Sequence, residues 1–290
     1  MGIAKTHSDS PSFVDRDPPL DREQVYRGEL VVFRALPAML GLVARARTMA
    51  EAAFAPHPPP LAQDTLGPED FLARAAALRR SFIHDGEARA AFRAVLESIG
   101  LEPDTTYADR LILRLQPSGG THSGRRVRDL PPHRDTWGSN LMAQINLWGP
   151  VFPLDPGATM VIWPTLFDHP VPNTSADWDL ERLREAPGCY PLLPVLRGSV
   201  GRARELPILI GPGDLLCFSG AHLHASRPNR SGRVRVSVDS RTVDLADLRA
   251  GRGAENVDGC APRDGRGWFH RVSDGVALTE ACTKHWSRSP

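Results

Sequence analysis

The chain has 290 residues, 41% of them hydrophobic and 24% charged, and its 35 basic and 34 acidic residues leave a net charge of +1. This balance argues against a protein that coats nucleic acid or binds membranes through a polybasic surface. A chain of this length can bury enough surface to fold without disulfide or metal staples. It has no apolar run of about 18 residues that would predict a transmembrane helix. The polar N-terminus does not resemble a signal peptide, so we expect a cytoplasmic protein.

The basic residues are almost all arginines, since Lys5 and Lys284 are the only lysines. The codon usage of a GC-rich bacterial genome would explain nearly all of this excess, because alanine, proline and glycine are abundant too. The functional alternative is that one or two arginines hold anions, since a planar guanidinium fits a carboxylate or a phosphate. The four cysteines lack CxxC or zinc-ligand spacing, which predicts free thiols in a reducing compartment.

In chain order, we predict a flexible N-terminus over residues 1–22 and a single domain over 23–290. The first part of that domain, 23–100, has apolar residues at helical spacing. We expect one helix over 28–55, which Pro37 should start or kink. A second helix should start at 67–70, and a third should cover 87–99.

From about residue 107 the pattern changes to short strands bounded by glycine and proline, which is typical of a sandwich or barrel. We predict a β core over 107–245 and a loop-rich tail over 246–290. The predicted strands cover 110–116, 142–148, 159–163, 207–210, 214–218 and 234–243. The last is the clearest, because valines alternate with arginine, serine and aspartate. The fold class is therefore α+β, and a double-sheet jelly roll is one architecture that fits.

The sequence His133-Arg134-Asp135 follows two prolines near the start of the β core. In an extended chain the side chains of residues 133 and 135 point to the same side, so an imidazole and a carboxylate can reach one metal ion. His224, which follows the predicted strand 214–218, is the best candidate for a third ligand. Two histidines and one carboxylate form the facial triad of non-haem Fe(II) oxygenases.

His222 competes with His224, because it lies two residues earlier and would point to the same strand face. We favour His224, since only it has a serine two residues later, Ser226, and an arginine eleven residues later, Arg235. Arg235 is expected on the inward face of the last strand, where a buried guanidinium needs an anion. A co-substrate with a free carboxylate would supply that anion through a bidentate pair.

These residues resemble a known family, the Fe(II)/2-oxoglutarate-dependent dioxygenases, in particular the phytanoyl-CoA dioxygenase-like branch. The resemblance covers about residues 107–245. The residues that carry it are the HxD sequence 133–135, the segment 213–218, His224 with Ser226, and Arg235.

The resemblance implies a double-stranded β-helix, a cupin-like jelly roll, with the N-terminal helices packed on it. It implies Fe(II) held by His133, Asp135 and His224, with 2-oxoglutarate and O2 as co-substrates. Arg235 and Ser226 would bind the distal carboxylate of 2-oxoglutarate. The implied activity is hydroxylation or another oxidation of an unactivated C–H bond in a small metabolite of a bacterial specialised biosynthetic pathway, with release of succinate and CO2. Halogenating relatives have alanine or glycine at the carboxylate position, so Asp135 favours hydroxylation.

Several other residues are weaker candidates. Asn140 could hydrogen-bond 2-oxoglutarate or the substrate. Trp137 could wall the substrate pocket, although a plain core position is the alternative, and Arg114 and Arg241 could meet the substrate or belong to surface and ion-pair positions. The polar insertion over 170–180 could contact the substrate, and the residues to test there are Asn173, Trp178 and Asp179. His122 is expected to be a loop residue over the pocket.

Two other functions compete with the oxygenase. One is a cupin-type metal enzyme that needs no 2-oxoglutarate, and the other is a non-catalytic barrel that binds a small molecule. Arg235 and Ser226 argue against the first, because such an enzyme has no use for them. The intact His-Asp-His set argues against the second, because burying these groups without a metal is costly. We expect a small-molecule substrate, no nucleic-acid partner and no membrane, and nothing in the sequence predicts an oligomeric state.

Overall fold

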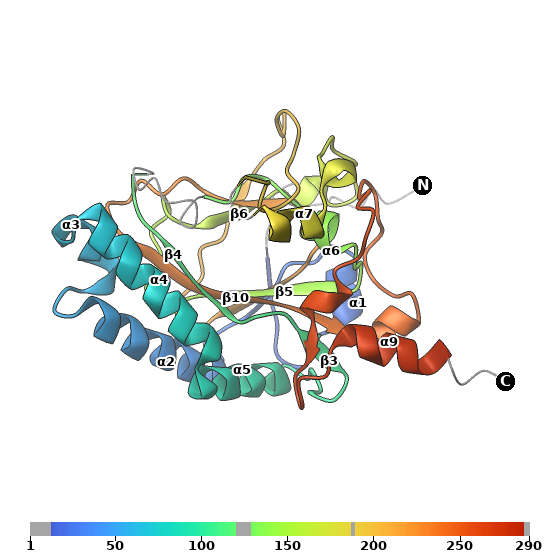
Figure 1. Cartoon of the computed structure of the whole chain (residues 1–290), viewed down its shortest axis with the longest axis horizontal. Helices are drawn as coiled ribbons and strands as arrows, with labels where there is room; N and C mark the ends of the chain where they lie inside the picture. Colours follow the sequence, from blue (N-terminus) through green and yellow to red (C-terminus); the bar gives the residue numbers. More distant parts are fainter. Residues whose placement is uncertain (1–12, 120–128, 187–188, 287–290) are drawn as a thin grey trace, which may run out of the picture.

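Two β-sheets and a group of helices make up the described part of the chain, residues 13–119, 129–186 and 189–286 of the computed structural model (Figure 1). The large sheet has the order β1-β2-β8-β5-β10-β3-β11, and β4 also pairs with β10. The small sheet has the order β7-β6-β9. Every pairing is antiparallel except that of β1 with β2.

The strands are short, as the turn residues of the sequence predict. Those of the large sheet are β1 (Val14–Asp15), β2 (Val31–Phe33), β3 (Thr106–Ala108), β4 (Ile112–Gln116), β5 (Gln144–Pro150), β8 (Leu215–Ser219), β10 (Arg235–Asp244) and β11 (His270–Arg271). Those of the small sheet are β6 (Met160–Ile162), β7 (Leu206–Pro207) and β9 (His224–Ser226).

Alternation along the strands sorts the side chains of the large sheet onto two faces. Val236 and Val238 of β10 pack into a core shared with the helices, together with Leu113 and Leu115 of β4. The residues that alternate with these valines along β10 point to the other face of the sheet, toward the small sheet. Two of them, Arg235 and Asp239, line a cavity there. The sequence pattern of β10 therefore places its polar side chains inside the molecule, between the two sheets.

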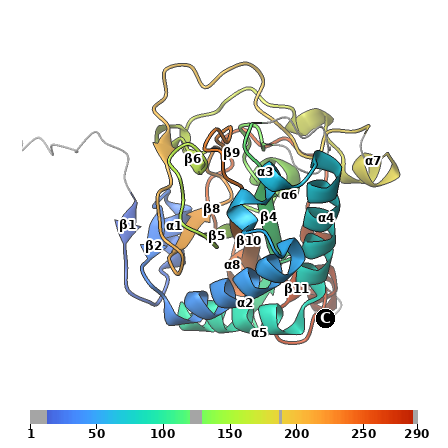
Figure 2. The same cartoon turned by 90° about the vertical axis from the view of Figure 1, so that its left-hand side faces the viewer.

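The N-terminal helices cover the outer face of the large sheet, opposite the small sheet (Figures 1 and 2). The N-terminal helices are α1 (Arg22–Tyr26), α2 (Pro37–Phe54), α3 (Ala62–Thr65), α4 (Pro68–His84) and α5 (Gly86–Ser98). Later in the chain follow α6 (Thr136–Ser139), α7 (Leu180–Glu185), α8 (Leu245–Arg249) and α9 (Leu278–Trp286). Short 3-10 turns are η1 (Pro59–Leu61), η2 (Pro164–Leu166), η3 (Ser175–Asp177) and η4 (Arg266–Trp268). Asp85 caps α5 by accepting from the Ala88 amide at 2.7 Å, and it pairs with Arg45 of α2 at 2.6 Å. This contact fixes α2 against α5.

The first predicted helix begins later than expected. Residues 31–33 form the buried strand β2 beside β8, and the helix starts at Pro37, where the missing amide hydrogen costs nothing. The β-branched Val31 and Val32 favour the strand. The predicted helices from 67–70 and over 87–99 are confirmed as α4 and α5.

The two ends of the chain also differ from the expectation. Residues 14–15 of the predicted flexible segment 1–22 pair with β2, while residues 1–12 lie outside the described part. The tail expected to be rich in loops contains α8 and α9, and β11 extends the large sheet. Within the described residues, no helix is long and apolar enough to cross a membrane. All four cysteines are free, as predicted: Cys189, Cys217, Cys260 and Cys282.

Candidate metal centre

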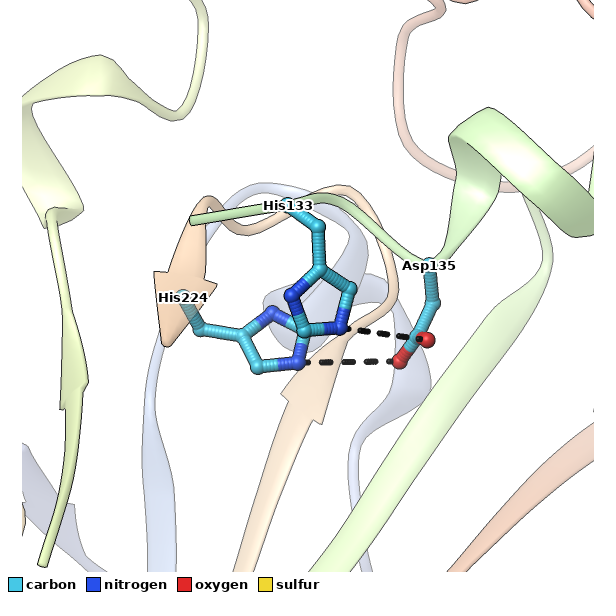
Figure 3. A group of neighbouring side chains, drawn as sticks. All are labelled: His133, Asp135 and His224. Atoms are coloured by element: carbon cyan, nitrogen blue, oxygen red, sulfur yellow. Dashed lines mark ion pairs between the residues drawn. The ribbon is translucent and has the colours of Figure 1, made fainter. Parts of the chain in front are cut away.

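The side chains of the three predicted metal ligands point toward one another (Figure 3). One ligand atom from each of His133, Asp135 and His224 lies within 4.8 Å of the other two. The Nε2 atoms of the two histidines are each 3.8 Å from one oxygen of the Asp135 carboxylate. Two imidazoles and one carboxylate on one side of a site suit Fe(II) and leave room for further ligands.

Backbone hydrogen bonds place the two histidines side by side. His133 and His224 form an antiparallel bridge, in which each amide donates to the other residue's carbonyl oxygen at 3.0 and 2.9 Å. Each ring also has its Nδ1 atom next to a backbone carbonyl oxygen, that of Pro131 at 2.8 Å for His133 and that of His222 at 3.0 Å for His224. A carbonyl oxygen only accepts, so Nδ1 carries the proton and Nε2 keeps its lone pair for a metal. Burial, with the neighbouring His224, lowers the pKa of His133 to about 3, which keeps this ring neutral.

The carboxylate reaches the site by a turn instead of an extended strand. Asp135 has right-handed helical backbone angles (φ −64°, ψ −32°) and begins α6, so the expected extended HxD geometry is wrong at its third residue. Asn146 donates to Asp135 Oδ2 at 2.6 Å, and Arg241 Nη1 lies 3.6 Å from Asp135 Oδ1. Burial alone would raise the pKa of Asp135, but Arg241, the histidines and Asn146 hold it below its ordinary value. The carboxylate is therefore ionised, as a metal ligand must be.

His222 is not part of this group. Its ring is fully buried and packs against Phe167 at a centroid distance of 4.4 Å. Its Nδ1 lies 3.2 Å from the Ser219 carbonyl oxygen and its Nε2 lies 3.1 Å from that of Gly28. Both ring nitrogens thus face backbone carbonyl oxygens and not the other ligand candidates. The expectation that His222 shares the face of His224 is wrong, because His222 precedes β9.

A cavity of about 330 Å³ opens beside the three ligands, and Arg235 and Ser226 line it. Arg235 is 5% exposed. Its Nη2 donates to Ser226 Oγ at 3.5 Å, but within the described residues its Nε and Nη1 have no hydrogen-bond partner. Burial lowers the pKa of Arg235 to about 10, which leaves it charged at neutral pH. The cavity therefore contains a buried, charged guanidinium whose Nε and Nη1 donors are unsatisfied, and an anion would satisfy them.

The other predicted site residues divide into two groups. Arg114 and Arg241 line the cavity, but both are paired, Arg114 with Asp239 at 3.0 Å and Arg241 with Asp109 and Asp135. Trp178 of the insertion also lines the cavity.

Three predicted site residues do not line the cavity: Asn140, Trp137 and Asn173. Asn140 is exposed and ends α6 in a left-handed conformation, so the cofactor role predicted for it is not supported. Trp137 is a core residue, and Asn173 donates to the carbonyl oxygens of Val171 and Asp258.

Asp179 caps α7 through the Glu181 amide, at 2.7 Å. The prediction for His122 falls on residues outside the described part of the chain.

Comparisons of the amino-acid sequence with known proteins gave no match. No family model matches the chain, and no curated protein matches it. Solved structures with a similar course of the chain include a non-heme monooxygenase, the ThoJ–Ni complex, at 15% identity and a TM-score of 0.44 over 92% of this chain and 95% of the other. Another is the epimerase SnoN in complex with Fe3+, alpha ketoglutarate and nogalamycin RO, at 16% identity and 0.43 over 84% and 94%.

A third is EvdO2 from Micromonospora carbonacea var. aurantiaca, at 13% identity and 0.45 over 88% and 99%. The three TM-scores lie below 0.5.

Sequence reasoning missed a set of residues that support the ligands. Arg134, the middle residue of the HxD, is 1% exposed and donates to the carbonyl oxygens of Leu166, Phe167, His169 and Ala221. Its Nε donates to the Asp258 carboxylate at 3.2 Å, and Trp137 Nε1 donates to the same group at 2.6 Å. The tail thus braces the segment that carries His133 and Asp135.

Asn146 was missed as well, although a signal was available. It is a polar residue between Ile145 and Leu147 in a strand that is otherwise buried and mostly apolar, and Gln144 Nε2 donates to its Oδ1 at 2.8 Å. Two side-chain amides at alternate positions of such a strand indicate that this face of the strand hydrogen-bonds other buried polar groups.

We expect the change Asn146→Ala to weaken Fe(II) or Mn(II) binding by about 10- to 100-fold, because Asp135 loses the donor that orients it. Isothermal titration with Mn(II) measures the effect. The matched control is Asn140→Gly, since Asn140 is exposed and glycine accepts its φ of 51°. An unchanged metal affinity in Asn146→Ala would show that Asn146 does not position the ligand.

Proposed function

We propose that this protein is an Fe(II)- and 2-oxoglutarate-dependent oxygenase, built as a double-stranded β-helix, that oxidises an unactivated C–H bond of a small metabolite. The observation that carries the proposal is Arg235: a buried, partly unsatisfied guanidinium in the same cavity as a His-Asp-His group. A metal site alone would not need this cation. A co-substrate that brings a carboxylate to one end of the cavity and chelates a metal at the other end would use both.

The residues present fit iron and 2-oxoglutarate. His133, Asp135 and His224 would hold the metal, and Arg235 with Ser226 would bind the distal carboxylate. When bound, iron and 2-oxoglutarate would supply the oxidising chemistry with O2 as the oxidant, and the co-substrate would leave as succinate and CO2. The chain's own residues set the conditions: the backbone carbonyls beside His133 and His224 hold the Nδ1 protons, and Asn146 and Arg241 hold the Asp135 carboxylate.

The structure bears differently on the two competing functions. A cupin-type metal enzyme without 2-oxoglutarate would leave Arg235 without an anion, which costs free energy in a buried site. A non-catalytic binding barrel would bring the buried His133 and His224 together with the half-buried Asp135 without a metal to offset the cost of burying them. The carboxylate of Asp135 further favours hydroxylation, or a related oxidation, over halogenation.

Purified protein supplied with Fe(II), ascorbate and 2-oxoglutarate is expected to release succinate slowly even without its own substrate, because the co-substrate site is complete. Succinate is measured by mass spectrometry alongside oxygen uptake. The variant Asp135→Ala, which lacks the metal-binding carboxylate, should release no more succinate than a metal-free sample. If the wild-type protein also stays at that background and does not bind 2-oxoglutarate, the proposed function is wrong.

A further inference from the structure

One wall of the cavity is a corner of large apolar side chains built around a glycine. We use the term aromatic corner for Gly138, Trp178, Pro194 and Trp268, which all line the cavity. Gly138 lies in α6, three residues after the metal-ligand candidate Asp135. A Cβ atom on Gly138 would lie 3.4 Å from Pro194 Cδ, 3.5 Å from Trp178 Cζ3 and 3.6 Å from Trp268 Cη2. Gly138 therefore lets these three side chains pack close together, and a side chain longer than alanine there would project into this wall of the cavity.

The two tryptophans present carbon surfaces to the cavity. Their ring centroids are 6.4 Å apart and the ring planes meet at 87°, so the two rings contact each other edge to face. The one polar atom of the Trp178 ring, Nε1, donates to the Pro191 carbonyl oxygen at 2.9 Å and needs no ligand partner. Leu180, Leu183 and Leu193 continue the apolar wall outward, to Leu192, which is 64% exposed.

The charges around the aromatic corner already have partners. Arg114 pairs with Asp239, and Arg241 pairs with Asp109 and Asp135 while its guanidinium lies 5.2 Å from the centre of the Trp268 ring. Among the described arginines that line the cavity, only Arg235 and the exposed Arg110 make no ion pair. In the proposed function, 2-oxoglutarate pairs with Arg235. The side chains of the aromatic corner carry no charge, so a charged group of a substrate would lose its hydration there, and of these arginines only Arg110 would be left to pair with an anion.

We propose that the aromatic corner binds an uncharged, apolar ring system of the substrate, aromatic or fused alicyclic, and holds it beside Asp135. An apolar ring would bury carbon surface against the tryptophans and leucines of this wall, where aromatic contacts add to area burial. The inference rests on the proposed function for the direction of the reacting bond, but ring binding itself does not depend on it. It predicts a ring-bearing neutral metabolite as the substrate class, in preference to a sugar or a molecule with a phosphate at the corner.

The test uses protein loaded with Mn(II) and 2-oxoglutarate, with 2-naphthol as the neutral ring probe and naphthalene-2-sulfonate and methyl glucoside as comparison probes. Calorimetry gives the dissociation constant of each probe and, on the same samples, that of 2-oxoglutarate. We expect the wild-type protein to bind 2-naphthol at least about tenfold more tightly than either comparison probe. The variant Gly138→Leu, which fills the corner, should weaken 2-naphthol binding at least about tenfold.

The matched control is Gly41→Leu on α2, where nothing lies within 4 Å of the new Cβ atom, and it should bind all probes as the wild type does. If Gly138→Leu does not fold, Gly138→Ala adds one methyl group at ordinary contact distance and should weaken 2-naphthol binding about threefold. Equal binding of the three probes, or 2-naphthol binding that neither Gly138 variant changes, overturns the inference. Failure of 2-oxoglutarate to bind, with a 2-naphthol site that Gly138→Leu removes, overturns the proposed function and supports the corner.

Discussion

Replacing His224 with alanine is expected to reduce the affinity for Fe(II) or Mn(II) by more than about 100-fold, which is beyond the loss expected for a supporting residue. The reason is that Nε2 of His224 supplies one of three ligand atoms that lie within 4.8 Å of one another. With two ligands left, the site holds a metal weakly and succinate formation should stop. Calorimetric titration with Mn(II) and the succinate assay measure the two effects separately.

The control for this prediction is His222→Gln. His222 is as buried as a ligand would be, but its ring nitrogens face the backbone carbonyls of Ser219 and Gly28. The glutamine variant is expected to lose some thermal stability and to bind metal with the wild-type stoichiometry. The opposite pattern, with metal lost in His222→Gln and kept in His224→Ala, would mean that the ligand assignment is wrong.

Replacing Arg235 with methionine is expected to have two effects of opposite sign. Affinity for 2-oxoglutarate should fall by about 30- to 4,000-fold, which corresponds to about 2–5 kcal/mol for truncating one partner of a buried charge pair. The ligand-free protein should become more stable by about 1–3 kcal/mol, because a buried guanidinium with two unsatisfied groups has been replaced by an apolar side chain. Calorimetry with 2-oxoglutarate and chemical denaturation of the metal-free protein measure these changes.

Arg233→Met provides the matched control, because Arg233 is exposed and lies two residues before Arg235 on the same segment. Arg233→Met should change neither the affinity for 2-oxoglutarate nor the stability of the ligand-free protein. Arg235→Lys keeps the charge but not the planar fork, so it should recover only part of the affinity. If Arg235→Met binds 2-oxoglutarate as tightly as the wild type, the guanidinium does not serve the co-substrate.

The central part of the site could be predicted from the sequence because its signals are local. His133 and Asp135 are two residues apart, Ser226 follows His224 by two, and Arg235 stands on a strand whose alternation is visible in its valines. The structure brings His133 and His224 together through one bridge between the two chain segments. The placements of His133, His224, Ser226 and Arg235 need only a strand or its end, so the residue pattern was sufficient for them. Asp135 differs, because it reaches the site from a turn at the start of α6.

The parts that escaped prediction depend on contacts between distant segments. Asp258 and Trp268 come from a tail with no strong periodicity, and they meet the site only because that tail folds back over α6. Strand β2 escaped for a different reason: it has three residues, and the helical pattern of α2 follows it closely. Asn140 was named because it follows Asp135 closely in sequence, and Asn146 was not considered, although it is the residue that hydrogen-bonds Asp135.

The hydrogen bonds of Asp258 affect how the protein could be shortened or recombined. Its carboxylate accepts from Arg134 and from Trp137, which flank the proposed metal ligand Asp135 at a distance of one and two residues, and from the Val171 amide. A protein engineer who trimmed the chain after β10 to obtain a minimal catalytic unit would remove this brace and also the Trp268 face of the cavity. The smallest unit that keeps the cavity and its brace intact therefore extends past Trp268.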